Sequence, residues 1–127
     1  DVNGHAWYPI TSLDMPPTVL AFEDAWFYDN ISLDVLHGML KSHGITRVWE
    51  LREGCEAGYE METELLDLYY DGTEGYWTSK CMDWLIYVSH ERSLTVAGEW
   101  LITAIQALWP RWNEHLYITY DFELPHR

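Results

Sequence analysis

Residues 82–89 read MDWLIYVS, and this segment decides the fold. In an extended strand its apolar side chains point to both sides, with Ile86 on one side and Tyr87 on the other. A strand that is apolar on both faces is typical of the centre of a sheet. The polar residues 90–93 then lead into a second apolar run at 94–97, so the sequence predicts a β-hairpin there.

Other short segments also have the alternation of strands: residues 46–52, 76–79 and 115–122. Trp49 falls in the first of them, and we interpret it as a core residue together with Trp84 and Trp109.

The segment from Tyr59 to Leu65 alternates almost without fault. One side carries mainly apolar side chains, and the other carries the carboxylates of Glu60, Glu62 and Glu64. The expected structure is a half-buried strand, with the core on one side and a row of carboxylates on the other.

Two amphipathic helices are predicted from apolar residues at helical spacing. The first spans residues 33–43, with Ser32 as its N-cap and Gly44 as its stop signal. The second begins after Gly98, and Pro110 ends it.

The N-terminal part has weaker signals. Residues 1–17 contain three prolines and an Asn-Gly turn signal, so we expect them to be irregular. Residues 18–29 are ambiguous between helix and strand, and we favour helix for part of them.

Because strands occur in runs, the sequence predicts a single α+β domain over residues 1–127. We expect a mainly antiparallel sheet of about five strands, with two or three helices packed on one face.

Composition restricts the class of protein. The 127 residues are 48% hydrophobic and 16% aromatic, which suits a packed core and not a disordered chain. The 21 acidic residues against seven Lys and Arg give a formal charge of −14. This charge disfavours bare nucleic acid or an anionic membrane as a partner, and it favours a basic protein, a cationic ligand or a metal ion. Simple solubility is the alternative explanation.

Location and cofactors are predicted from what the sequence lacks. There is no pattern of a secretory signal peptide and no apolar run as long as a membrane span. Nothing in the sequence requires Cys55 and Cys81 to pair, so we expect a cytoplasmic protein with reduced thiols. Neither cysteine belongs to a CxxC motif and no calcium loop is present, so we predict no metal or other cofactor.

An acidic segment lies between Arg52 and Lys80, where no basic residue occurs. On one strand face its carboxylates would be about 7 Å apart, within the screening length of ~8 Å at physiological salt. They would repel one another until a cationic partner binds. We predict the partner-binding residues here: Glu56, Glu60, Glu62, Glu64, Asp67, Tyr69, Tyr70, Asp71 and Glu74. A solvated sheet face is the alternative for any one of them.

His90 and Glu91 form the pair most like part of an enzyme, at the end of the central strand. Histidine can act as a general base near neutral pH, here with Asp83 or Asp121 as a further acid. The alternative is a turn in which Glu91 pairs with Arg92 or another basic residue. No nucleophile motif or glycine-rich phosphate loop accompanies the pair.

In its size, its charge of −14, its aromatic content and its lack of a catalytic motif, the chain resembles the small immunity proteins that bacteria pair with polymorphic toxins. The resemblance is one of general character over the whole chain and involves no signature motif. It implies a non-enzymatic inhibitor whose acidic surface occludes the basic active-site face of a toxin. Acidic phage proteins that mimic the charge of DNA have a similar composition, so both interpretations stay open.

Overall fold

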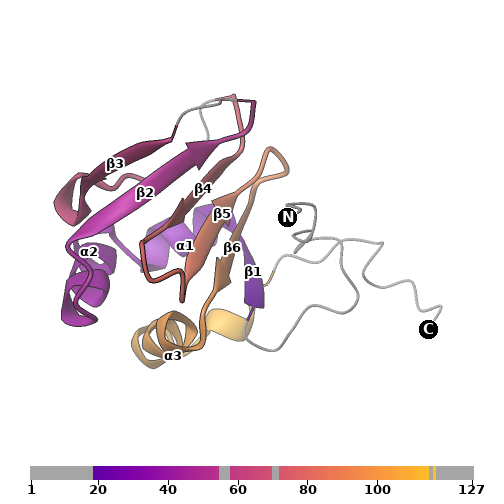
Figure 1. Ribbon diagram of the computed structural model, residues 1–127. Helices are drawn as coiled ribbons and strands as arrows, with labels where there is room; N and C mark the ends of the chain where they lie inside the picture. The colour runs from indigo at the N-terminus through magenta and orange to yellow at the C-terminus, as the bar shows by residue number, and fades with distance from the viewer. Residues whose placement is uncertain (1–18, 55–57, 70–71, 115, 117–127) are drawn as a thin grey trace.

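The computed structural model describes residues 19–54, 58–69, 72–114 and 116. Six antiparallel strands form one sheet in the order β1-β6-β5-β4-β2-β3 (Figure 1). The strands are β1 (Val19–Glu23), β2 (Arg47–Arg52), β3 (Tyr59–Glu62), β4 (Gly75–Thr78), β5 (Leu85–Val88) and β6 (Ser93–Ala97). The helices are α1 (Asp24–Asn30), α2 (Leu33–Ser42) and α3 (Glu99–Leu108), with short 3-10 turns η2 (Thr63–Leu65) and η3 (Trp112–Glu114). The predicted α+β class is confirmed, with six strands instead of about five.

The central hairpin is confirmed as β5 and β6. Ile86 lies opposite Val96, and Tyr87 lies opposite Thr95 on the other face. Both faces of β5 are buried at these positions, since Ile86 is fully buried and Tyr87 is 7% exposed. This burial explains why the strand is apolar on both sides.

Residues 18–29, for part of which we favoured helix, contain both a helix at Asp24–Asn30 and an additional strand at Val19–Glu23. Val19–Glu23 forms β1, and α1 follows it directly. Pairing with β6 places Phe22 opposite Leu94, and both side chains are fully buried. This pairing across more than 70 residues overrides the local preference, because strand formation depends on the neighbouring strand.

The three helices and one face of the sheet enclose a single hydrophobic core. Phe27 of α1, Leu36 of α2 and Leu101 of α3 are each buried in it, as are Trp84 and Trp109, which the sequence predicted. Figure 1 shows α1 and α2 behind the sheet and α3 along its lower end. We call this side of the sheet the helix face and the opposite side the outer face.

The predicted strand over 59–65 is wrong in its second half. β3 ends at Glu62, and η2 follows because Thr63 turns into the protein. The buried hydroxyl of Thr63 donates to the carbonyl of Ile45 at 3.0 Å. Residues 66–69 then pass along the helix face with Leu66 and Leu68 in the core. The three glutamates therefore do not share one strand face.

Two terminal predictions lie mainly outside the described residues. Residues 1–17 are not among them, and of the strand predicted over 115–122 only Leu116 is. Leu116 makes an antiparallel bridge to Phe22 of β1.

Gly98 joins β6 to α3 at a position that excludes a side chain. Its φ is +113°, and an added Cβ would lie 2.6 Å from the Asp83 carbonyl oxygen and 2.9 Å from Trp84 Cα. Gly38, in the middle of α2, has no atom within 4 Å of an added Cβ.

We expect Gly98→Ala to lower the free energy of unfolding by about 1–3 kcal/mol, because it forces strain onto the backbone. Gly38→Ala should raise it by about 0.5–1 kcal/mol, because alanine loses less entropy in a helix. Urea unfolding measures both changes. Equal effects of the two substitutions would contradict this account of the β6–α3 connection.

Candidate functional site

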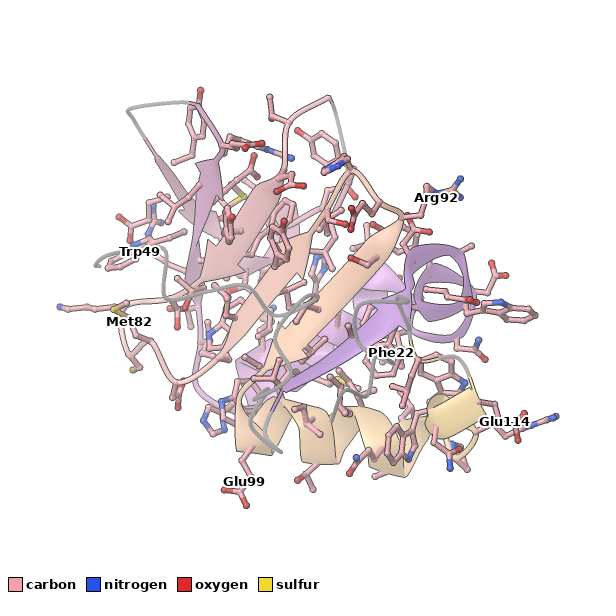
Figure 2. All side chains as sticks on the ribbon, turned by 90° about the vertical axis from the view of Figure 1, so that its right-hand side faces the viewer. Phe22, Trp49, Met82, Arg92, Glu99 and Glu114 are labelled. Atoms are coloured by element: carbon pink, nitrogen blue, oxygen red, sulfur yellow. The ribbon has the colours of Figure 1, made fainter. Side chains whose placement is uncertain are left out.

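β2 turns Val48 and a polar pair inward, and it turns Trp49 and Leu51 outward. Glu50 and Arg52 are buried on the helix face, at 8% and 7% exposure. On the outer face Leu51 is 45% exposed and Trp49 is half-buried. The prediction that Trp49 belongs to the core is therefore wrong, and Figure 2 shows it on the side of the sheet away from α1.

The strand register gathers aromatic, aliphatic and acidic side chains on the outer face. Leu51 lies opposite Tyr76 of β4, and Trp49 lies opposite Glu60 of β3. Glu53 continues the same side of β2, since its N–H extends the ladder to the Glu74 carbonyl at 2.9 Å. We name this set the outer-face patch: Trp49, Leu51, Tyr76, Glu53, Glu60 and Glu62.

The carboxylates of the patch differ in their internal partners. Glu60 accepts a hydrogen bond from Arg47 Nε at 3.0 Å, with both side chains 52% exposed. Glu53 and Glu62 are exposed and form no ion pair with a described residue. Two carboxylates of the patch thus have no ion-pair partner among the described residues.

A hollow of about 250 Å³ lies at one end of the patch. Trp49 and Glu60 line it from the sheet, and Lys80 and Cys81 line it from the loop after β4. Cys81 is exposed, whereas Cys55 lies outside the described residues. The hollow offers an aromatic wall and both signs of charge to a side chain of a partner.

The predicted partner-binding residues fall on two sides of the molecule. Glu60, Glu62 and Glu74 belong to the outer face. Glu64 lies on the helix side, where it pairs with Lys41 of α2. Asp67 lies beside Tyr28 on that same side, and Tyr69 stacks on Arg52. The remaining three lie outside the described residues: Glu56, Tyr70 and Asp71.

Arg52 and Glu50 form a buried ion pair that ties the sheet to the residues after β3. Arg52 Nε donates to Glu50 Oε2 at 3.0 Å, and Trp77 Nε1 donates to Glu50 Oε1 at 3.0 Å. The guanidinium lies 4.4 Å from the Tyr69 ring centroid and 4.9 Å from that of Trp77. It also donates to the carbonyls of Tyr69 and Thr73. These contacts offset the cost of burying both charges.

A second polar cluster lies on the outer face at the end of β5. Glu74 accepts hydrogen bonds from the hydroxyl of Tyr87 and from Nδ1 of His90. The backbone N–H of His90 also donates to Glu74, at 3.2 Å. Tyr87 stacks on Tyr76 with ring centroids 4.7 Å apart, which connects this cluster to the outer-face patch.

The pKa values of this cluster follow from its hydrogen bonds. Burial would raise the pKa of Glu74, but the bonds from Tyr87 and His90 outweigh it and hold the pKa below its ordinary 4.5. The hydrogen bond to Glu74 in turn raises the pKa of His90 above its ordinary 6.5. Burial and the bond to Glu74 raise the pKa of Tyr87.

The carboxylate that orients His90 is Glu74, which sequence reasoning assigned to the partner-binding segment. Glu91 lies farther away, with its Oε2 3.9 Å from His90 Nε2, and Arg92 pairs with Asp24 instead. Asp83 bonds to His43. A histidine held through Nδ1 presents Nε2 to solvent, as a general base requires. The hydroxyl of the neighbouring Ser89 is unsuited as a nucleophile, because it is buried and hydrogen-bonded to the hydroxyl of Ser93.

An apolar groove of about 560 Å³ separates α2 from α3. Val35 and Met39 line one wall, and Trp100 and Leu108 line the other. The ring of His43, which also lines the groove, stacks on Trp100 with ring centroids 3.7 Å apart. This groove lies on the helix side, away from the outer-face patch.

In the parts of the chain that the structure describes, no helix is both long and apolar enough to cross a bilayer. The same residues contain no group of three or more His, Cys, Asp or Glu side chains placed to hold a metal ion. Comparison with protein-family models, curated proteins and solved structures gave no match.

Removing Arg52 should destabilise the protein severely. We expect Arg52→Met to lower the free energy of unfolding by about 3–5 kcal/mol, because it leaves the Glu50 carboxylate buried and unpaired. Arg47→Met removes an exposed pair and should cost about 1 kcal/mol or less. Urea unfolding of both variants is the measurement, and similar losses would contradict the role assigned to Arg52.

The Glu74–His90 contact should make stability depend on pH in two directions. Glu74 contributes stability above pH 4.5, which is lost as the pH falls through its lowered folded pKa. His90 contributes below pH 6.5, and this part is lost as the pH rises through its raised folded pKa. The difference in the free energy of unfolding between wild type and His90→Gln should therefore be largest between pH 4.5 and pH 6.5. It should shrink as the pH rises through the raised folded pKa of His90.

An NMR titration of the His90 ring tests directly whether the hydrogen bond to Glu74 raises the pKa of His90. Glu74→Gln should bring the pKa of His90 down, and Glu91→Gln should lower it less, because Glu91 is not hydrogen-bonded to the ring. An unchanged His90 pKa in Glu74→Gln would refute the contact.

Proposed function

We propose that this chain is a non-enzymatic binding module, an immunity or inhibitor protein that uses its outer-face patch to bind a basic protein such as a toxin. One observation carries the proposal: exposed Leu51 and half-buried Trp49 lie among the exposed carboxylates of the outer-face patch, and two of these, Glu53 and Glu62, form no ion pair with a described residue. An apolar centre with a polar rim is the usual composition of a protein–protein interface.

The distribution of basic residues supports a basic partner. Five of the seven Lys and Arg side chains are held in ion pairs within the chain: Lys41, Arg47, Arg52, Arg92 and Arg111. None of the five forms an ion pair with Glu53 or Glu62, which stay exposed on the outer face. A positive surface would therefore be attracted from a distance and bound fastest at low salt.

The apolar centre distinguishes this proposal from attraction by charge alone. Carboxylates steer the approach of a partner and set its salt dependence, but burial of aromatic and aliphatic side chains slows its dissociation. Trp49 and Leu51 supply that area, and the neighbouring hollow of about 250 Å³ can receive a side chain of the partner. A basic active-site face would be covered by such contacts.

Internal ion pairs decide which carboxylates can be mutated to test binding. Glu60 and Glu64 have internal partners, so reversing their charge would disturb the fold's own ion pairs. Glu53 and Glu62 have none among the described residues and are the better probes. Asp29 of α1 and Glu99 of α3 are exposed carboxylates on helices and serve as matched controls.

The test uses the protein as bait in native extract of the source cell, followed by kinetics with the protein that it retains. We expect Glu53→Lys with Glu62→Lys to slow association about tenfold at low salt, and Leu51→Asp to accelerate dissociation. Asp29→Lys with Glu99→Lys should change both rates much less. Equal effects of the two charge reversals would place the interface elsewhere.

The retained protein decides the inhibitory role. If it is toxic or nucleolytic when expressed alone, the wild-type chain should suppress that activity and Leu51→Asp should not. An unaffected activity would refute an inhibitor. Competition by duplex DNA for the same binding site would favour the DNA-mimic interpretation over a dedicated toxin inhibitor.

A further inference from the structure

β3 is an edge strand, and the ladder shows which of its backbone groups face outward. The Thr63 N–H donates to the Thr46 carbonyl at 3.0 Å, in register with Arg47 opposite Glu62. Hydrogen-bonded and non-bonded pairs alternate in an antiparallel ladder. Val48 and Met61 are therefore a bonded pair, and the N–H and C=O of Glu60 and the N–H of Glu62 point away from the sheet.

The ladder on the other side of β2 agrees with this assignment. The Glu53 N–H bonds to the Glu74 carbonyl, in register with Leu51 opposite Tyr76. Odd-numbered residues of β2 thus bond to β4, which leaves the even-numbered residues to bond to β3. The free edge therefore presents two donors and one acceptor, which are the N–H groups of Glu60 and Glu62 and the C=O of Glu60, because the C=O of Glu62 accepts the first bond of η2.

The same two residues place their side chains on the outer face. Glu60 lies opposite Trp49 and Glu62 lies opposite Arg47, and both glutamates are exposed. On an added strand, residues opposite these glutamates would have Cβ atoms about 4.5–5.5 Å from theirs. Lys or Arg at alternate positions would meet both carboxylates while the backbone groups pair.

We infer that a basic, extended segment of the partner adds to the free edge of β3 as a seventh strand, with Lys or Arg at alternate positions. This inference rests on the proposed function, because it states how a basic partner engages the outer-face patch. Backbone bonds to Glu60 and Glu62 hold the segment, and their carboxylates select its sequence. Strand addition to an exposed sheet edge is a general mode of peptide recognition.

Charge also selects this occupant over a second copy of the chain. Two β3 edges that met would bring glutamates against glutamates, and like charges on facing strands are destabilising. Charged side chains protect sheet edges from self-association for this reason. The residues that exclude a second copy are those that accept a basic strand.

A short blocked peptide that alternates Lys and Val is the probe, and the matching Glu–Val peptide is its control. With the Lys–Val peptide we expect amide exchange of Glu60 and Glu62 to slow, whereas the amide of Met61 already bonds to β2. Absence of this protection, or equal binding of the Glu–Val peptide, would overturn strand addition.

Glu62 allows the backbone contribution to be separated from the charge. Its φ is −66° and its ψ is 145°, which proline adopts without strain. Glu62→Gln removes the charge and keeps the outward N–H, and Glu62→Pro removes both. Glu62→Pro should bind the Lys–Val peptide about fivefold to tenfold more weakly than Glu62→Gln, which is the loss expected for one hydrogen bond. Equal affinities would mean that only side chains bind.

Kinetics with the retained partner distinguish this inference from the proposed function. If Leu51→Asp weakens binding and Glu62→Pro does so more than Glu62→Gln, both hold. If Leu51→Asp weakens binding and the two Glu62 variants are equal, the outer-face patch binds the partner without strand addition. If none of the three changes binding, both proposals fail.

Discussion

Arg52 is held between the rings of Tyr69 and Trp77 and bonded to Glu50, and these contacts decide which side of β2 faces inward. A strand with Trp49 and Leu51 on one side would ordinarily bury that side. Here the side with Val48, Glu50 and Arg52 is buried instead, and the cost of burying the two charges is offset because the guanidinium and the carboxylate bond to each other and share Trp77 as a neighbour. As a consequence, Leu51 and Trp49 lie on the outer face.

The same cluster fixes the segment that links β3 to β4. Arg52 donates to the carbonyls of Tyr69 and Thr73, while Leu66 and Leu68 pack into the core. Because this segment is held on the helix side, its exposed residues Asp67 and Tyr69 cannot share a surface with Glu60 and Glu62 of β3. One long acidic segment is thereby divided between two sides of the molecule.

The carboxylates of this acidic chain have two different roles, which the net charge does not distinguish. Glu50 and Glu74 are buried acceptors that hold side chains in place, and they are unavailable to a partner. Glu53 and Glu62 are exposed, and neither forms an ion pair with a described basic residue. At the free edge of β3 the charge both opposes self-association and favours a basic strand. The exposed carboxylates on the outer face and at the edge of β3 thus say more about the kind of partner than the formal net charge of −14 does.

The sequence by itself determined the class of fold, the central β5–β6 hairpin, α2 and the start of α3, because apolar periodicity, caps and turn residues are local signals. It also located the acidic residues. Only the tertiary structure decided that residues 19–23 pair with β6, that Thr63 ends β3, and that Glu74 is a buried partner of Tyr87 and His90. Alternation along a strand assigns side chains to two faces, but it does not state which face is inside. That choice depends on contacts between residues far apart in the chain, such as Arg52 with Tyr69 and Trp77.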